Sequence, residues 1–357
     1  MGFFLKMKSP LHNCQRLCVI LPSWIGDTVM ATPALRALRK NLPNTHITLL
    51  GRAGLRTILS GLPVFDECVE HRMRGWLGPF SNLKPIRAIH ADAMLLFPNS
   101  MRSALIAYAS GARTRIGWNR QNRGWFLSHP ATPPFMTTPF SSVDNYCNLT
   151  ELALGTTITD RTVQLHCTTE ELATGFRLLD GLPMPRVILN PGANRLDKRW
   201  SAENFAALAI ALRKKCGAGV AVTGSESERN VVDAIVSASQ GAAISLIERG
   251  VTLDGLKGAI AQADLLITND TGPRHIAAGF NTPCVSLFGP TDHRFTTLYE
   301  PNNSNAAETP REWLLIADPF LPKEVIANHV AKIARVDRIS VGDVTYAATQ
   351  LLNAKLR

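Results

Sequence analysis

An acidic residue follows the first apolar run of the chain, in the segment Pro22-Ser-Trp-Ile-Gly-Asp27. If this run is a strand, a carboxylate at its carboxyl end lies where doubly wound folds bind ligands. There it can accept the proton of an attacking hydroxyl group, which is general-base chemistry. Asp is also favoured at the start of a helix, where it bonds free amides and complements the helix dipole. The pattern alone leaves both interpretations of Asp27 open.

A polar segment over residues 268–275, Thr-Asn-Asp-Thr-Gly-Pro-Arg-His, follows another apolar run. Pro273 is typical of a first helical turn, and free amides at a helix N-terminus bind phosphate groups. Gly272 allows the backbone to approach a ligand closely, and His275 can hydrogen-bond the same anion. The segment predicts an anion site, with the candidate residues Asp270, Thr271, Gly272 and His275. The alternative is an ordinary strand-to-helix turn with His275 packed beneath it.

Two further segments offer groups that suit a nucleotide. The run Asn190-Pro-Gly-Ala-Asn194 leads to Lys198 and Arg199, whose charges can neutralise a diphosphate leaving group. Glu226 and Glu228 follow the next apolar run, and acidic residues bind ribose hydroxyls in other nucleotide-binding folds. The alternatives are a surface pair of cations and a helix start stabilised by Glu side chains. Spacing alone does not decide between them.

Arginines alternate with tryptophans between residues 113 and 125. Arginine binds phosphate through two parallel hydrogen bonds, and tryptophan packs on sugar rings or lipid headgroups. We therefore expect an anionic acceptor to bind at Arg113, Arg115, Arg120 and Arg123. Arginine with aromatic residues also suits stacked bases, but no known nucleic-acid motif accompanies the cluster. We expect no nucleic-acid partner.

The candidate residues stand at the ends of predicted strands. Apolar runs predict strands at 17–22, 46–50, 92–97, 186–190, 219–223, 265–268 and 284–288. Helical patterns lie at 34–40, 101–110, 168–179, 202–215, 228–239, 323–335 and 346–356. Continuous apolar strands alternating with helices indicate parallel sheets covered on both faces. We predict an α/β fold of two doubly wound domains, with ligands at the carboxyl ends of the strands.

The length of 357 residues exceeds what one core usually supports, which favours two domains. We expect an N-terminal domain over residues 1–180 and a second domain over residues 181–322. C-terminal helices over 323–357 could cross back to the first domain. The segment Gly181-Leu-Pro183 is the expected hinge.

Charge and motifs narrow the function classes. Residues 1–150 hold 17 Lys and Arg against 6 Asp and Glu, whereas residues 151–357 hold 21 against 22. This asymmetry predicts an anionic partner for the first half, or only a solvated face.

No apolar run approaches the ~18–20 residues of a membrane span. The seven cysteines show no Cys-x-x-Cys spacing, which disfavours a disulfide framework or zinc site and favours the cytoplasm. No glycine-rich dinucleotide motif or P-loop motif occurs, so redox and NTPase functions lose their main support.

Five segments in order resemble the ADP-heptose:lipopolysaccharide heptosyltransferases of glycosyltransferase family 9. They are Leu21-Pro-Ser-Trp-Ile-Gly-Asp-Thr-Val-Met-Ala31, Asn190-Pro-Gly-Ala193, Lys198-Arg-Trp200, Asp270-Thr-Gly272 with His275, and Phe288-Gly-Pro-Thr-Asp292. The first looks most like the heptosyltransferase II group. The resemblance runs from about residue 17 to about residue 300. Residues 301–320 depart from the family, since they lack the cysteine that members commonly carry there.

The resemblance implies a GT-B architecture, in which two Rossmann-like domains face a deep cleft. The first domain would hold the acceptor and the second the nucleotide sugar. By the same resemblance, Asp27 matches the catalytic base and Lys198 the lysine that contacts the donor diphosphate. Glu228, with Glu226 as second choice, falls where the family binds nucleoside hydroxyls. Asp270, Thr271, Gly272 and His275 match the donor-binding loop.

The implied activity is inverting transfer of heptose from ADP-L-glycero-D-manno-heptose to the lipopolysaccharide inner core. It needs no cofactor and no obligate metal. The implied partners are ADP-heptose and an anionic inner-core acceptor at the inner membrane, so we expect a cytoplasmic protein that associates peripherally with that membrane. The alternatives are a sister transferase with another nucleotide sugar or core acceptor, and a non-catalytic nucleotide-sugar-binding protein. The latter has no need of both Asp27 and Lys198.

Overall fold

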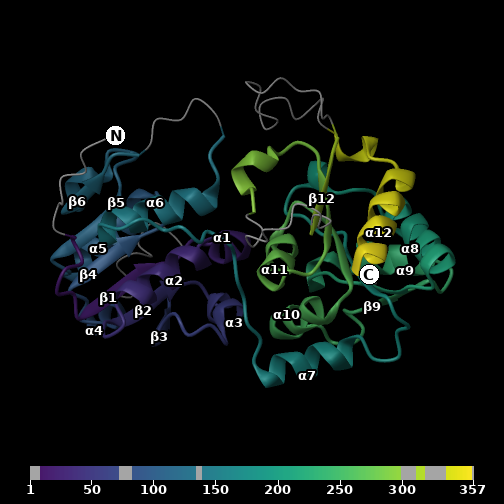
Figure 1. Ribbon diagram of the computed structural model, residues 1–357, viewed down its shortest axis with the longest axis horizontal. Helices are drawn as coiled ribbons and strands as arrows, with labels where there is room; N and C mark the ends of the chain where they lie inside the picture. The colour runs from purple at the N-terminus through teal and green to yellow at the C-terminus, as the bar shows by residue number, and fades with distance from the viewer. Residues whose placement is uncertain (1–8, 72–82, 134–138, 299–310, 318–334, 356–357) are drawn as a thin grey trace. The chain divides into compact units, whose positions relative to one another are not determined.

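The computed structural model describes residues 9–71, 83–133, 139–298, 311–317 and 335–355 (Figure 1). The chain forms two compact units, which divide between Val163 and Gln164. The N-terminal one is named unit 1 and the C-terminal one unit 2.

Unit 1 contains a six-stranded sheet with the order β3-β2-β1-β4-β5-β6, and every neighbouring pair is parallel. Its strands are β1 (Arg16–Ile20), β2 (His46–Gly51), β3 (Glu67–Glu70), β4 (Ala93–Leu96), β5 (Thr114–Trp118) and β6 (His129–Ala131). Its helices are α1 (Ile25–Met30), α2 (Thr32–Asn41), α3 (Leu55–Leu59), α4 (Leu83–Ala88), α5 (Met101–Ser110), η1 (Arg123–Phe126) and α6 (Ser142–Leu154). The strand order reverses between β1 and β4. The carboxyl ends of these two strands therefore form the switch point at which open α/β sheets bind ligands.

Unit 2 repeats this topology with the order β12-β11-β10-β7-β8-β9, again with parallel pairs only. Its strands are β7 (Arg186–Asn190), β8 (Gly219–Val222), β9 (Ala243–Ser245), β10 (Leu265–Asn269), β11 (Cys284–Phe288) and β12 (Glu312–Ile316). Its α-helices are α7 (Thr169–Leu178), α8 (Ala202–Cys216), α9 (Arg229–Ala238), α10 (Leu253–Gln262), α11 (Gly272–Phe280) and α12 (Val341–Lys355). Short 3-10 helices are η2 (Leu196–Lys198), η3 (Glu226–Glu228), η4 (His293–Thr296) and η6 (Val336–Arg338). The switch point of unit 2 lies between β7 and β10.

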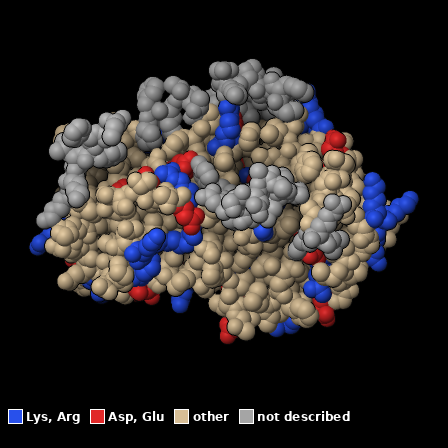
Figure 2. Space-filling model, in the orientation of Figure 1, with Lys and Arg blue, Asp and Glu red and all other residues tan. Residues whose placement is uncertain are grey.

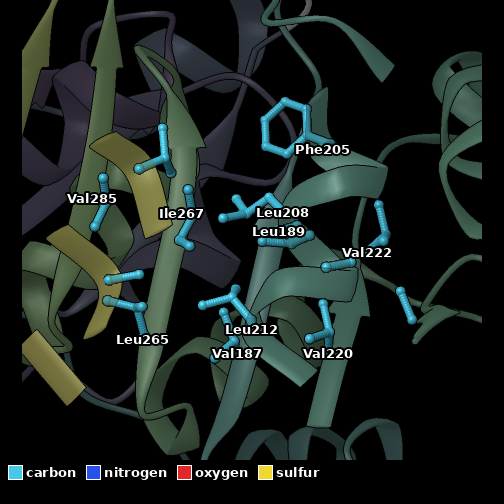
Figure 3. Close-up of a cluster of buried hydrophobic side chains, with 14 of the residues drawn as sticks. Val187, Leu189, Phe205, Leu208, Leu212, Val220, Val222, Leu265, Ile267 and Val285 are labelled. Atoms are coloured by element: carbon cyan, nitrogen blue, oxygen red, sulfur yellow. The ribbon is translucent and has the colours of Figure 1, made fainter. Parts of the chain in front are cut away.

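The core of unit 2 supports the carboxyl ends of these strands. Figure 3 shows side chains of β7, β8 and β10 beside those of α8. Val187, Leu189 and Ile267 come from the strands, Leu208 and Leu212 come from the helix, and all five are fully buried. Full burial of such a side chain contributes about 1.5–3 kcal/mol. The sheet is thus a rigid base for the loops that follow β7 and β10.

The predicted doubly wound α/β architecture is confirmed in each unit. The expected strands at 186–190 and 284–288 and the expected helix at 101–110 have the observed bounds of β7, β11 and α5. The sequence pattern did not predict β3, β5, β6, β9 and β12, which lie toward the edges of the two sheets. Edge strands are less buried, so their sequences lack continuous apolar runs.

The division between the units lies before the expected boundary at residue 180, because α7 packs on α10 of unit 2. Gly175 of α7 lies so close to α10 that a Cβ atom there would stand 2.1 Å from the carbonyl carbon of Gly258. In the same contact, Lys257 Nζ lies 2.9 Å from Glu171 Oε2, with both side chains buried. The expected hinge at Gly181–Pro183 therefore lies inside unit 2.

The C-terminal helix α12 also belongs to unit 2, where it packs on α8 and β11 (Figure 1). Of the helical pattern expected at 323–335, all but the last residue lies outside the described residues. Within the described part of the chain, no helix is both long and apolar enough to cross a membrane.

Candidate active site

Asp27 stands at the switch point of unit 1, in the first turn of α1. The helix is preceded by Trp24 at the N-cap position, and no side chain caps it. The Asp27 carboxylate accepts a hydrogen bond from the Tyr146 hydroxyl, with an O···O distance of 3.1 Å. Asp27 is partly exposed. Asp27 is the third residue of α1, so its charge also lies in the first turn, where it complements the helix dipole.

Tyr146 comes from α6 and is buried, with 6% of its surface exposed. Its ring packs on Phe97, with 5.1 Å between the ring centroids. Burial, and then the negative charge of Asp27, raise the pKa of Tyr146 well above its ordinary value. The phenol consequently stays protonated at neutral pH and donates its hydrogen bond to Asp27. Sequence analysis missed Tyr146, since its only signal was a hydroxyl on the buried face of a helix.

An ion pair lies at the switch point of unit 2. Lys198 Nζ, at the end of η2, is 3.0 Å from Asp270 Oδ2, directly after β10. The same Asp270 oxygen accepts a hydrogen bond from Thr291 Oγ1 at 2.8 Å. Burial alone raises the pKa of Asp270, but the charges of Lys198 and Arg274 outweigh this effect and hold the pKa below its ordinary value. Asp270 is therefore ionised and holds the Lys198 ammonium group in place at the carboxyl ends of β7 and β10.

Two asparagines join the loops that follow β7 and β10. Asn190 donates from Nδ2 to Thr268 Oγ1 at 2.8 Å and to Thr271 Oγ1 at 2.9 Å. Asn269 donates to the Pro191 carbonyl oxygen at 2.8 Å, and its Oδ1 accepts from the Trp200 amide at 3.2 Å. Both asparagine side chains are buried. Their hydrogen bonds therefore hold the two loops in fixed positions relative to each other.

Helix α11 begins within the predicted anion site. Thr271 is its N-cap residue with extended backbone, Gly272 is its first residue, and the Thr271 side chain makes no capping bond. His275 lies in the same first turns but is only 4% exposed, and its Nδ1 has no hydrogen-bond partner among the described residues. Burial, followed by the charge of Arg274, lowers the pKa of His275 to about 3. His275 is therefore a neutral imidazole packed beneath the turn at neutral pH.

The carboxylate of Glu228 lies against the glycine of the loop after β7. A Cβ atom on Gly192 would stand only 2.2 Å from Glu228 Oε1. Oε2 of Glu228 accepts from the Ser225 amide at 2.8 Å and from Ser225 Oγ at 2.7 Å. Glu226, in contrast, is exposed and binds Arg229 at 2.6 Å. Of the two candidate glutamates, Glu228 is the one beside the loop that leads to Lys198.

The predicted arginine cluster is divided by the structure. Arg123 is fully buried, and its guanidinium donates to the carbonyl oxygens of Trp118 at 2.9 Å and Pro98 at 2.5 Å. Burial, followed by the charge of Arg120, lowers the pKa of Arg123 to about 10, so it stays protonated. The prediction that Arg123 binds an acceptor needs correction. Its side chain ties the loops after β4 and β5 together instead.

The other three arginines are accessible to different degrees. Arg113 is exposed, whereas Arg115 and Arg120 are partly buried. Arg115 donates from Nε to the Phe126 carbonyl oxygen at 2.7 Å and from Nη1 to the Ala112 carbonyl oxygen at 2.5 Å. The Nε of Arg120 is buried and has no hydrogen-bond partner in the described part of the chain. Arg113 therefore offers the most accessible cation of the cluster.

A sequence profile decides the family. Residues 80–312 match glycosyltransferase family 9 (heptosyltransferase). The chain belongs to glycosyltransferase family 9. Lipopolysaccharide heptosyltransferase 2 of Escherichia coli K12 is 28% identical over 298 residues, which cover 79% of this chain and 84% of that protein. The fold is also that of a solved structure, Escherichia coli ADP-heptose LPS heptosyltransferase II, with a TM-score of 0.77. That structure is 23% identical to this chain, and the match covers 96% of this chain and 100% of that one.

A second solved structure supports the same fold. The family 9 glycosyltransferase from Veillonella parvula DSM 2008 matches with a TM-score of 0.78 and 23% identity, over 95% of this chain and 97% of that one. The GT-B class predicted for this glycosyltransferase is thereby confirmed as two Rossmann-like units. In the described residues of this family 9 chain, no group of three or more His, Cys, Asp or Glu side chains is placed to hold a metal ion.

Proposed function

We propose that this family 9 glycosyltransferase transfers heptose from ADP-heptose to the lipopolysaccharide inner core, with inversion at the anomeric carbon. The observation that carries the proposal is the Lys198–Asp270 pair, 3.0 Å apart beside the start of α11. A fixed cation next to a helix N-terminus suits a diphosphate, because both stabilise negative charge. The related Escherichia coli protein is named as an ADP-heptose LPS heptosyltransferase, which supports the choice of donor and acceptor.

The donor occupies unit 2 in this proposal. Lys198 neutralises the diphosphate, and the amides around Thr271 and Gly272 bind its oxygens. Asp270 keeps Lys198 in position, and neutral His275 supports the turn from below. Glu228 accepts hydrogen bonds from the ribose hydroxyls. The leaving ADP is then stabilised as its negative charge develops.

The acceptor hydroxyl reacts next to Asp27 in a single displacement. A bond forms between the hydroxyl oxygen and the anomeric carbon of heptose while the bond from that carbon to the ADP phosphate oxygen breaks. The hydroxyl proton moves to the Asp27 carboxylate. A free Asp has a pKa near ~3.9, which is low for a base at neutral pH. Proton transfer therefore comes late, after the oxygen has begun to bond to carbon and has become more acidic.

The acceptor is bound through its negative charge by arginines of unit 1 in this proposal. The inner core is an anionic glycolipid at the cytoplasmic face of the inner membrane, and exposed Arg113 with Arg115 and Arg120 suits its phosphates. Peripheral membrane association through such cations weakens as salt is added. We therefore place the protein in the cytoplasm, at the inner membrane.

The direct test combines purified protein, ADP-heptose and heptosyl-Kdo2-lipid A, and follows ADP release and product mass. We expect one added heptose, with activity that persists in EDTA because no step uses a metal. ADP-heptose binding without product would contradict this acceptor and point to another core acceptor. Absence of binding to both ADP-heptose and ADP would contradict the donor.

The hydrogen bond from Tyr146 to Asp27 gives a prediction for Tyr146→Phe. The ring packing on Phe97 is retained, but a hydrogen bond to a charged group, worth about 1.5–3 kcal/mol, is lost. We expect kcat to fall roughly tenfold with a small change in the KM of the donor. The acid side of the kcat/KM pH profile should move to higher pH, because a bond that favours the carboxylate form is gone. The control is Tyr346→Phe on the exposed surface of unit 2, for which we expect no change in kcat or in the pH profile. If Tyr146→Phe also left both unchanged, the role of Tyr146 would be limited to packing.

The contact between Gly192 and Glu228 gives a prediction for Gly192→Ala. The added methyl group would overlap Glu228 Oε1, and a flexible carboxylate can move away without unfolding the loop. Loss of charge-assisted bonds to ribose should weaken ADP binding about 10–100-fold, measured by calorimetry. Gly342→Ala in α12 is the control, because its nearest neighbour would be 3.5 Å away. Equal ADP affinity in both variants would remove Glu228 from the nucleoside site.

A further inference from the structure

Unit 1 carries an exposed aromatic group on α5 and η1. Trp125 has 91% of its surface exposed and Tyr108 has 57%, whereas Trp118 in the neighbouring strand is 2% exposed. Large aromatic side chains contribute stability when buried, so a nearly fully exposed tryptophan on η1, which contacts the helix that carries an exposed tyrosine, is uncommon on a free surface. Neither ring takes part in the proposed reaction.

Ring contacts link part of this group to an arginine. The Tyr108 and Phe126 rings meet edge to face at 5.6 Å, and the Arg115 guanidinium lies 5.5 Å from the Tyr108 ring centroid. Arg115 also donates to the Phe126 carbonyl oxygen at 2.7 Å. Arg87 of α4 donates from Nε to the Ala109 carbonyl oxygen at 3.0 Å, which places a cation beside the end of α5. We name Arg87, Tyr108, Arg115, Trp125 and Phe126 the aromatic–arginine surface.

The stretch of sequence that carries this surface is basic. Residues 71–143 contain nine Lys and Arg and a single acidic residue, Asp92. The Asp92 carboxylate accepts hydrogen bonds from the backbone amides of Gln15 at 3.0 Å and Arg16 at 2.8 Å. It therefore belongs to the start of β1. On the face drawn in Figure 2, Lys and Arg side chains stand in separate small groups, several of them beside acidic residues.

The combination fits the interface of a lipid bilayer. Tryptophan and tyrosine concentrate at the headgroup level of membranes, where an apolar ring and a polar edge are both satisfied. Cations next to them are attracted to anionic headgroups. A nucleic acid is less well matched, because successive bases need several open aromatic faces. Here the Arg115 guanidinium lies 5.5 Å from the Tyr108 ring centroid, and Tyr108 and Phe126 are turned edge to face.

We propose that the aromatic–arginine surface docks unit 1 on an anionic lipid bilayer, with the Trp125 ring inserted among the headgroups. Arg87 lies over a lipid phosphate in this arrangement. The proposal deepens the membrane association proposed above and rests on it, by naming the side chains that make the contact. It does not depend on which sugar is transferred.

The experiment measures binding of the full chain to sedimented vesicles. Vesicles of phosphatidylcholine with phosphatidylglycerol are compared with vesicles of phosphatidylcholine alone. We expect wild-type protein to bind only the anionic vesicles. Trp125→Ala should bind them about tenfold more weakly, and Arg87→Glu about fivefold or more, in line with the attraction of one cation to such a surface. Both side chains are surface groups, so the variants are expected to keep the wild-type melting temperature.

Phe176→Ala is the matched control. Phe176 in unit 2 is 51% exposed and has Arg186 5.7 Å from its ring centroid, which copies the aromatic–arginine pairing outside the basic half of the chain. Its vesicle binding should equal that of the wild type. Equal loss in Phe176→Ala and Trp125→Ala, or wild-type binding by Trp125→Ala, would overturn the proposal. So would a wild-type protein that binds single-stranded oligonucleotide through Trp125 but no vesicles.

ADP binding, measured in the same preparations, separates this proposal from the proposed function. If ADP binds and the vesicle experiment fails, the aromatic–arginine surface is not a membrane contact and the transferase proposal stands. If vesicles bind through Trp125 but ADP does not, the donor assignment fails while the surface remains.

Discussion

Asp27→Asn should lower the turnover of heptose transfer by about 10²–10⁴-fold, which is the usual contribution of a positioned general base. The amide keeps the size of the carboxylate and an oxygen that can accept the bond from Tyr146 Oη, now 3.1 Å from Asp27 Oδ1. It can no longer take a proton. Because Lys198, Glu228 and the start of α11 are untouched, ADP should bind with wild-type affinity. Single-turnover kinetics with ADP-heptose measure the chemical step directly.

Asp160→Asn is the matched control within unit 1. The Asp160 side chain is 61% exposed and pairs with Arg36 at 3.0 Å, and exposed ion pairs contribute about 0–1 kcal/mol. Its turnover should therefore be that of the wild type. If Asp27→Asn kept at least a third of wild-type turnover, the base would have to be sought elsewhere. If it lost ADP binding too, the loss of turnover would report on folding or donor binding and the assignment would lack support.

The contrast between central and edge strands shows how far the fold could be predicted. Central strands such as β7 and β11 are buried on both sides, so their sequences are largely apolar and their bounds could be predicted. β5 contains Arg115 and the buried Trp118, and its mixed pattern was interpreted as part of an anion-binding cluster. β3 is only four residues long and has a glutamate at each end. Short, half-exposed strands have too few apolar positions to show a period.

The candidate site was predictable where topology fixes it. Asp27 and Asp270 follow the strands at the two switch points, so strand assignment alone brings them to the ligand-binding edge. Tyr146 reaches Asp27 from 119 positions away, and no local pattern encodes that contact. The prediction that Arg123 binds an acceptor failed for a different reason. Arginines are seldom fully buried, yet carbonyl oxygens of Pro98, Ser100 and Trp118 satisfy this one inside unit 1.

The contact of α7 with α10 carries the second large expected effect. Lys257 has a fully buried side chain, and its ammonium group lies 2.9 Å from Glu171 Oε2, whose side chain is 6% exposed. Lys257→Met fills similar volume but leaves the Glu171 carboxylate buried without its cation. Removal of one partner from a buried pair typically costs about 3–5 kcal/mol. We expect the urea midpoint to fall accordingly. Lys214→Met, at an exposed position of α8, should change the free energy of unfolding by less than about 0.5 kcal/mol.

The double variant Lys257→Met, Glu171→Gln tests whether charge is the cause. Glu171 Oε2 also accepts the Thr168 amide at 2.8 Å and completes the capping box of α7, and a glutamine oxygen can keep that bond. With both charges gone, most of the lost stability should return, since neutral replacements of buried pairs are often tolerated. A double variant no more stable than Lys257→Met would assign the loss to packing around Gly175 and Gly258 instead. Recovery would show that α7 is held to unit 2 by a buried charge pair, which is why the division between the units precedes this helix.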